Sequence, residues 1–357
     1  MMKPFLFVLG TRPEAIKLLP LVWEFQKREL PYEILHTDQH AELLDDLLTR
    51  HQISPDYRLF LFGRTSGLCD LKAQMLTQMR QVLADRQFSA VLVQGDTLSA
   101  LVGAEYGFFN ALPVVHIEAG MRTYRQDDPS PEEALRRMIA PMARLHFCPS
   151  EDEARHLLGE GIPPAQIFTV GNSFADYWLT CPPSAITPKK QILITIHRRE
   201  NLPFLDGIFA RIKEITGEYS EYEFLFPVHP NPMIIERAEA MLKDVPNLHL
   251  RPPMPPDEFY GELLSSEMIV TDSGGVQEEC IFHAKKVLIL RKVSERRADF
   301  EFSMLVDPED PTLKEKFHAL LAKPTEETHC GYYGSGGTAR KIVEILKNRA
   351  LNEVDAP

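Results

Sequence analysis

The sequence predicts an α/β protein of two domains, each built around a parallel β-sheet. Two observations lead to this prediction. The chain has 357 residues, of which 44% are hydrophobic and 25% charged, and this length exceeds what a single hydrophobic core usually supports. Short apolar runs also alternate with helical patterns along the chain, and this alternation is typical of βαβ units in a parallel sheet.

The alternating elements form two series. In the first, apolar runs predict strands at residues 5–9, 33–36, 90–93 and 113–117. Apolar residues at helical spacing predict a helix at residues 14–27 and another from about residue 41. A second series begins after Gly171, with strands predicted at residues 191–195, 224–227, 248–250, 268–270, 287–290 and 304–306. Two similar series predict two Rossmann-like halves.

The boundary between the halves is expected in or just before residues 177–190, which are rich in proline and lack periodicity. We therefore predict an N-terminal domain at residues 1–172 and a C-terminal domain at residues 173–340. A last helix is predicted at residues 338–349. For the C-terminal helix and tail at residues 341–357, packing on the C-terminal domain and a return to the N-terminal domain are both open.

Charge and composition favour a small-molecule enzyme of the cytoplasm. The formal net charge is −12, with no compensating block of Lys and Arg, so binding to nucleic acid or to an anionic membrane would work against the average field. No apolar run approaches the roughly 18 residues of a membrane span, and the first run, at residues 5–9, is too short for a secretory signal. The five cysteines form no CxxC pair, which predicts neither a disulfide framework nor a zinc site.

Acidic residues stand in loops directly after predicted strands, where open parallel sheets bind their ligands. QGDT at residues 94–97 and EAGMR at residues 118–122 each follow a strand, and PEE at residues 131–133 opens a helix. Each acid by itself could cap a helix or complement its dipole. Three acids that converge on one crevice instead favour proton transfer, because neighbouring carboxylates raise one another's pKa.

Other loops after strands are suited to an anion. GTRPE at residues 10–14 leads into a helix N-terminus, with Arg12 and Lys17 nearby. HRREN at residues 197–201 and HPNP at residues 229–232 also follow strands. A plain strand-to-helix turn is the alternative for the first of these, and we favour a functional role for the second because its His can shuttle a proton.

The sharpest local motif is TDSGGVQEE at residues 271–279, where a strand meets a Ser-Gly-Gly turn and then a helix. The backbone N–H groups and the helix dipole of such a turn favour an anion. One helical turn on, Glu278 or Glu279 can accept hydrogen bonds from ribose hydroxyls. A purely structural glycine turn is the alternative. The chain has no P-loop motif and its first domain no GxGxxG, so neither ATP hydrolysis on a P-loop nor a dinucleotide cofactor is expected.

These motifs together resemble the UDP-N-acetylglucosamine 2-epimerase family, in the right order over nearly the whole chain. The matching segments are GTRPEAIK at 10–17, QH at 39–40, QGDT at 94–97, EAGMRT at 118–123, PEE and Arg136 at 131–136, HRREN at 197–201, HPNP at 229–232, DSGGVQEE at 272–279 and YGSG at 333–336. The resemblance implies a GT-B-like fold with the active site in the interdomain cleft. It also implies a UDP-linked sugar substrate, no cofactor, no metal and a homodimer.

The chemistry implied by the resemblance is C2 epimerisation of a UDP-N-acetylhexosamine, for example UDP-GlcNAc to UDP-ManNAc. UDP is eliminated to leave a 2-acetamidoglucal and is then added back. The residues that match the family's acid/base positions are Asp96, Glu118, Glu132 and His197. The residues that match its substrate-binding positions are Arg12, Lys17, Arg136, His229, Ser273, Gly274, Gly275 and Glu279. The carboxylates fall in the N-terminal domain, and the C-terminal domain is expected to bind the nucleotide.

The sequence departs from the family pattern at several positions. Leu135 stands where the family has Asn, Ala140 where an Asp is common, and Ser335 replaces the Asp of YGDG. Residues 294–298 read SERRA instead of TERPE, and residues 39–43 read QHAEL instead of QHRxM, so the Arg of the family's second, regulatory site is missing. Polar groups lost near the sugar would fit a different substrate, such as a UDP-2,3-diacetamido-uronic acid.

Three further alternatives remain open. A hydrolysing epimerase would release UDP and free ManNAc. A GT-B glycosyltransferase or a non-catalytic nucleotide-sugar binder would share the nucleotide site. Retention of all four acid/base residues argues against the binder, because a binder has no need of Asp96 and Glu132.

Overall fold

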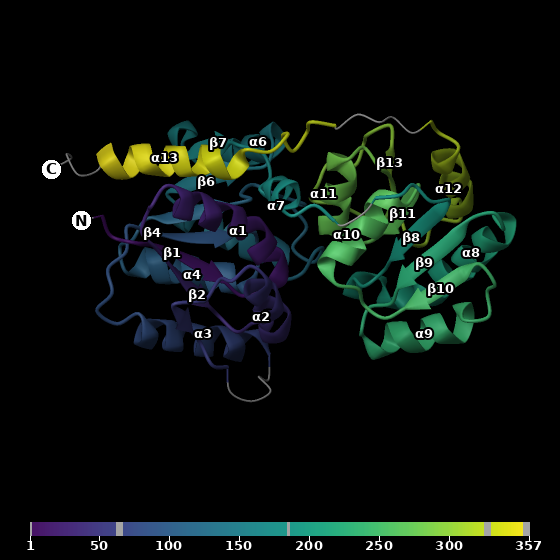
Figure 1. Ribbon diagram of the computed structural model, residues 1–357, viewed down its shortest axis with the longest axis horizontal. Helices are drawn as coiled ribbons and strands as arrows, with labels where there is room; N and C mark the ends of the chain where they lie inside the picture. Colours follow the sequence, from purple (N-terminus) through teal and green to yellow (C-terminus); the bar gives the residue numbers. More distant parts are fainter. Residues whose placement is uncertain (1, 62–66, 184–185, 325–329, 353–357) are drawn as a thin grey trace. The chain divides into compact units, whose positions relative to one another are not determined.

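The computed structural model describes residues 2–61, 67–183, 186–324 and 330–352 and divides the chain into two compact units (Figure 1). Unit 1 consists of Met1–Thr180 and Tyr333–Pro357, and unit 2 of Cys181–Tyr332. Within the described residues each unit is built on one parallel sheet, so the predicted α/β fold with two Rossmann-like domains is confirmed. Helices in the described part of the chain fall short of the length and apolarity needed to cross a membrane.

The sheet of unit 1 has the strand order β3-β2-β1-β4-β5-β6-β7. Its strands are β1 (Phe5–Leu9), β2 (Tyr32–His36), β3 (Tyr57–Arg58), β4 (Ala90–Gln94), β5 (Val114–Ile117), β6 (Leu145–Cys148) and β7 (Ile167–Thr169). Its helices are α1 (Arg12–Lys27), α2 (Ala41–Arg50), α3 (Leu68–Val82), α4 (Leu98–Phe109), α5 (Glu132–Ile139), α6 (Glu151–Gly159), α7 (Phe174–Thr180) and α13 (Thr338–Asn352), with 3-10 turns η1 (Ala140–Met142) and η2 (Pro164–Gln166).

The sheet of unit 2 has the order β10-β9-β8-β11-β12-β13. Its strands are β8 (Gln191–Thr195), β9 (Glu223–Pro227), β10 (Leu248–Arg251), β11 (Met268–Thr271), β12 (Lys286–Leu290) and β13 (Ser303–Val306). Its helices are α8 (Leu205–Glu218), α9 (Pro232–Leu242), α10 (Pro256–Ser265), α11 (Gly274–Phe282) and α12 (Leu313–Leu321), with a 3-10 turn η3 (Arg199–Phe204).

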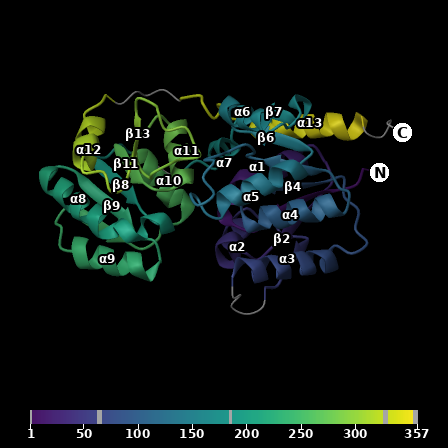
Figure 2. The same ribbon diagram turned by 180° about the vertical axis from the view of Figure 1, so that it is seen from behind.

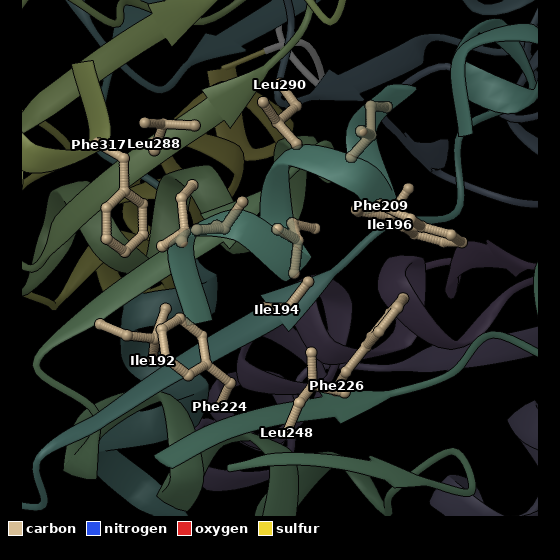
Figure 3. Packing of buried hydrophobic residues seen from close by; sticks show 14 of the residues in the cluster. Ile192, Ile194, Ile196, Phe209, Phe224, Phe226, Leu248, Leu288, Leu290 and Phe317 are labelled. Atoms are coloured by element: carbon tan, nitrogen blue, oxygen red, sulfur yellow. The ribbon is translucent and has the colours of Figure 1, made fainter. Parts of the chain in front are cut away.

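The central strands of unit 2, β8, β11 and β12, are buried and mostly apolar because both faces of the sheet are covered. Ile192 and Ile194 of β8 belong to the larger core cluster, which includes side chains of α8, α9 and α12 (Figure 3). Leu193, which lies between them, belongs to a second cluster with side chains of α10 and α11. Successive residues of a strand thus enter opposite cores, as the two-residue repeat of a strand requires.

Both sheets reverse their strand order at one place. Counted from the first strand of each unit, the order 3-2-1-4-5-6 is common to both, and unit 1 adds a seventh strand at its edge. The reversal lies between β1 and β4 in unit 1 and between β8 and β11 in unit 2. Ligands of open α/β sheets bind beyond the carboxyl ends of the strands at such a switch point.

The structure differs from the sequence prediction in two respects. Strands β3, β6 and β7 were not predicted. In addition, residues 173–180 and 333–340 lie in unit 1 rather than in the second domain. The reason is packing, because α7 and α13 both contact α1 (Figures 1 and 2), and Asp176 of α7 accepts a hydrogen bond from the backbone N–H of Ala339 at 2.8 Å.

Candidate active site

The loops after β1 and β4 meet at the switch point of unit 1. Thr11 caps α1, and Thr97 caps α4 by accepting a hydrogen bond from the N–H of Ala100 at 2.9 Å. The two loops approach so closely that a Cβ on Gly10 would collide with the side chains of Ser99 and Thr37. Glycine is therefore required here for backbone approach, and both helix N-termini open at the edge of the sheet where an anion is favoured.

Two of the sequence-predicted carboxylates contact predicted substrate-binding cations. Arg136 Nε donates to Asp96 Oδ2 at 3.1 Å, and the guanidinium of Arg136 is 3% exposed. Lys17 forms an ion pair with Glu118, and both side chains are almost fully buried. The structure thus brings together residues after β4 and β5 with residues of α5 and α1, and it places a cation against each carboxylate, which the sequence did not predict.

Glu118 occupies a strained position at the end of β5. Its φ of 61° lies in the left-handed region, which costs a residue with a side chain about 1 to 2 kcal/mol. Such outliers persist at functional sites, where the surrounding structure holds them. The contacts that hold Glu118 include the ion pair with Lys17 and a hydrogen bond from Asn172 Nδ2 at 3.4 Å.

The adjacent acids Glu132 and Glu133 have different surroundings. The carboxylate of Glu133 is fully buried and accepts hydrogen bonds from the backbone N–H groups of Thr123 at 2.9 Å and Tyr124 at 3.1 Å. It also accepts one from Arg136 Nη1 at 3.3 Å. Glu132 is half-buried. Glu133 therefore fixes the loop after β5 to α5, whereas Glu132 keeps the solvent access that exchange with a ligand requires.

In unit 2, one carboxylate holds the loop after β8 against the end of β11. Asp272 is fully buried and accepts hydrogen bonds from the N–H of His197 at 3.0 Å, the N–H of Arg198 at 2.9 Å and Asn201 Nδ2 at 3.0 Å. These two loops flank the switch point of unit 2. Asp272 therefore sets where the first residues of HRREN stand relative to the Ser-Gly-Gly turn.

The two predicted histidines of unit 2 are neighbours. The ring centroids of His197 and His229 are 5.5 Å apart. Burial, and next the charge of His197, lower the pKa of His229, which favours its neutral form. The pair follows two adjacent strands, β8 and β9, so both rings lie beyond the carboxyl ends of the sheet.

The Ser-Gly-Gly turn forms the N-terminus of α11, with Ser273 at the cap position. A Cβ on Gly274 would collide with the guanidinium of Arg296, whereas Gly275 is exposed and has open space around it. Glu278 is 1% exposed and its carboxylate pairs with Arg296 at 2.9 Å, but Glu279 is partly exposed. Of the two acids that the sequence offered for a ribose, Glu279 is the one that a ligand can reach.

Sequence reasoning missed two residues that shape the site, Asp272 and Glu133. Both residues belong to motifs named in the sequence analysis. However, the sequence around an acid does not show whether its carboxylate bonds to the protein's own backbone or contacts a ligand. One feature of the sequence could have singled out Asp272. It stands just before the Ser-Gly-Gly turn, whereas the cap position of the helix is occupied by Ser273. Among the described residues, no three His, Cys, Asp or Glu side chains are grouped in a way that would hold a metal ion.

The positions that depart from the family pattern lie in two kinds of surroundings. Leu135 and Ala140 are buried in hydrophobic clusters of unit 1. Ser335 and Arg297 are exposed, and the guanidinium of Arg297 stacks over the ring of Phe300 at 5.2 Å. The first two substitutions therefore belong to the core and not to a surface that a sugar could contact.

Two Rossmann-like units, with acids and cations at one switch point and a Ser-Gly-Gly turn that opens a helix at the other, define an α/β enzyme of GT-B-like fold. The family model described as UDP-N-acetylglucosamine 2-epimerase matches residues 24–347. The chain belongs to this family.

Individual relatives match over nearly their whole length. The chain is 34% identical over 355 residues to the UDP-N-acetylglucosamine 2-epimerase of Bacillus subtilis (strain 168), covering 95% of this chain and 93% of that one. It is similar to the crystal structure of UDP-GlcNAc 2-epimerase from Neisseria meningitidis bound to UDP-GlcNAc, with a TM-score of 0.88, 33% identity and coverage of 98% of this chain and 100% of that one. The glycotransferase of kitacinnamycin, at a TM-score of 0.59 and 12% identity over 100% of both chains, shares the fold alone.

Proposed function

We propose that this chain interconverts UDP-GlcNAc and UDP-ManNAc by eliminating UDP and adding it back. The proposal is carried by the position of the loops with the predicted acid/base and anion-binding residues, which stand at the switch points of two Rossmann-like sheets in a member of the UDP-N-acetylglucosamine 2-epimerase family. As the resemblance implies, the proposal includes a homodimer in the cytoplasm.

We assign the nucleotide to unit 2. The N-terminus of α11 directs backbone N–H groups at an anion, so Ser273, Gly274 and Gly275 would bind the diphosphate. Glu279 would accept hydrogen bonds from the ribose hydroxyls, and His229 would contact the phosphates. These groups bind UDP equally before and after the reaction, and they hold it in place while the sugar is detached.

We assign the chemistry at the sugar to unit 1 together with His197. A carboxylate takes the proton from C2, the C1–O bond breaks, its electron pair stays on UDP, and C1 and C2 become doubly bonded in the glycal. Return of a proton to the opposite face of C2 and of UDP to C1 completes the inversion. Asp96, Glu118 and Glu132 would move the protons, and Arg12, Lys17 and Arg136 would stabilise the charge that develops on UDP.

Leu135 and Ala140 lie within hydrophobic clusters, so these two departures from the family pattern do not point to a modified sugar. Ser335 and Arg297 are exposed, and a modified sugar stays the second candidate on their account. The hydrolysing reaction uses the same elimination and differs only in what traps the glycal, so the products decide between the two outcomes.

Proton NMR in deuterated water tests the function directly. The purified protein with UDP-GlcNAc is expected to yield UDP-ManNAc that carries deuterium at C2, because the abstracted proton exchanges with solvent before it returns. Free ManNAc with UDP would assign the chain to the hydrolysing branch. Epimerisation without deuterium at C2 would contradict the proton-transfer mechanism.

Glu279→Ala is expected to weaken UDP binding by about 10- to 100-fold, because hydrogen bonds to a charged group contribute about 1.5–3 kcal/mol and each 1.4 kcal/mol is tenfold in affinity. Isothermal titration calorimetry measures this change. Glu239→Ala is the matched control, since Glu239 is exposed on α9 of the same unit. Equal UDP affinity of both variants would remove Glu279 from the ribose site.

A further inference from the structure

Glu14 links the two loops that meet at the switch point of unit 1. It lies in the first turn of α1 and is fully buried. Its Oε2 accepts a hydrogen bond from the N–H of Gly10 at 3.0 Å, and its Oε1 accepts one from the hydroxyl of Thr97. Gly10 opens the loop that carries Arg12, and Thr97 follows Asp96 directly. The side chain of Glu14 thus connects the segment of Arg12, a predicted substrate-binding residue, to the loop of Asp96, a predicted acid/base residue.

A helix-dipole role does not account for this burial. An acid that complements a helix N-terminus does so at the surface, where its charge remains hydrated. Glu14 instead contacts neutral donors, and burial raises the pKa of Glu14 to about 7, although hydrogen bonds from Thr97, Thr11 and Gly10 lower it. A buried carboxyl group without a cation opposes folding, so its presence calls for a role that an apolar residue cannot fill.

The packing of the loops makes their separation sensitive to this link. A Cβ on Gly10 would collide with Ser99, and the hydroxyls of Ser99 and Thr37 are 2.6 Å apart. The N–H of His40 donates to the carbonyl of Gly10 at 2.9 Å. Charged or titratable side chains on the segments that meet here are Arg12, Lys17, Asp38, His40 and Asp96. Loss of the link would let the loops after β1 and β4 separate and move Arg12 away from Asp96.

We propose that Glu14 is a positioning residue that sets the distance between the Arg12 turn and the Asp96 loop. This inference rests on the proposed function for its effect on turnover. Glu14 acts through Arg12 and Asp96 and does not itself contact the substrate. The hydrogen bonds, not the charge, perform this role, because a protonated Glu14 can still accept from Gly10 and donate to Thr97.

Glutamine and leucine separate hydrogen bonding from volume. Glutamine reproduces the protonated acid, with an oxygen for the N–H of Gly10 and an NH2 group for the hydroxyl of Thr97. Leucine fills similar space without either bond. Glu14→Leu is therefore expected to lower kcat at least tenfold and to weaken UDP binding severalfold, and Glu14→Gln to recover most of both losses.

A second variant approaches the same link from its other end. Thr97→Val removes both the bond to Glu14 and the cap of α4, and it is expected to lower kcat at least as much as Glu14→Leu. Thr97→Ser keeps the hydroxyl and is expected to keep both. When Glu14→Leu and Thr97→Val are combined, the fold-loss in kcat should be smaller than the product of the two single fold-losses, because both substitutions remove the same hydrogen bond. Glu105→Leu is the matched control, since Glu105 is a buried acid of unit 1 that pairs with Lys72. It is expected to change stability but not turnover.

The pH dependence of unfolding provides a readout besides turnover. The pKa of Glu14 is raised from its ordinary value of 4.5 to about 7 in the folded protein. Between those values the folded state keeps a proton that the unfolded state has lost, so stability falls as pH rises through this window. The free energy of unfolding of the wild type should therefore fall relative to that of Glu14→Gln as the pH rises from about 4.5 to 7. Above about pH 7 the difference between the two proteins should stay constant.

The deciding experiment measures kcat on UDP-GlcNAc, UDP affinity by calorimetry and urea unfolding for these variants. Recovery by Gln but not by Leu, in kcat and in UDP affinity, supports the proposal. Wild-type values for Glu14→Leu overturn it, and so does a Gln variant as impaired as Leu. If the wild type binds UDP but leaves UDP-GlcNAc unchanged, the proposed function fails, and the UDP affinities of the variants still decide the role of Glu14.

Discussion

Asp96→Asn and Glu132→Gln are each expected to lower turnover of UDP-GlcNAc by about 10²- to 10⁴-fold, which is the usual contribution of a positioned acid or base. Both replacements keep the size of the side chain and remove its ability to take a proton. Asn still offers an oxygen to Arg136, whose Nε donates to Asp96 at 3.1 Å. UDP affinity should change little, since Asp96 and Glu132 are assigned to proton transfer and not to contacts with the nucleotide.

Steady-state kinetics and calorimetry on the same preparations check this result. Asp85→Asn is a suitable control, because Asp85 is exposed in the loop before β4. This loop lies at the amino ends of the strands, whereas the candidate site lies at their carboxyl ends. A variant of Asp96 or Glu132 with normal turnover would refute its acid/base role. A joint loss of turnover and UDP affinity would instead indicate that the residue binds substrate.

Asp272→Ala is expected to destabilise the folded protein by at least about 3 kcal/mol, because it leaves three donors without their acceptor at about 1–3 kcal/mol each. Three donors depend on this carboxylate: the N–H groups of His197 and Arg198 and the amide of Asn201. UDP binding should also weaken, since the loop after β8 loses its attachment to the Ser-Gly-Gly turn.

Urea unfolding measures the loss in stability, with Asp206→Ala as the reference substitution. Asp206 is 64% exposed and its pairing distance to Arg237 is 3.5 Å, so its removal should change the free energy of unfolding by less than about 1 kcal/mol. Equal stability of the two variants would show that the loop after β8 is held by other contacts.

The fold was predictable where strands are buried on both faces. The central strands of unit 2 read as mostly apolar runs, and β8 was predicted with its observed bounds, Gln191–Thr195. Three strands of unit 1 were missed for physical reasons. β3 has two residues, β7 has three and is a partly exposed edge strand, and β6 has only four. Burial of these segments is set by tertiary neighbours, which a local pattern does not contain.

The candidate site was predictable as a set of loops but not as a set of contacts. Motifs after strands located the acids and the glycine turn, because strand ends meet at one edge of a parallel sheet. The pairing of Asp96 with Arg136 joins residues 40 positions apart, and no spacing rule supplies it. Likewise, Glu133 is buried and Glu132 is accessible because the backbone N–H of Thr123 bonds to the carboxylate of Glu133. The sequence does not show which of the two adjacent acids this loop contacts.

The return of α13 to unit 1 has a consequence for biosynthesis. Ile342, Val343 and Leu346 of α13 are buried, and the helix packs on α1 and α7. A ribosome must therefore synthesise all of unit 2 before the N-terminal unit can cover that surface. At the usual rate of roughly 5–20 residues per second, this interval is on the order of 10 s. The later unit can finish folding first, and maturation of the earlier one awaits synthesis of α13.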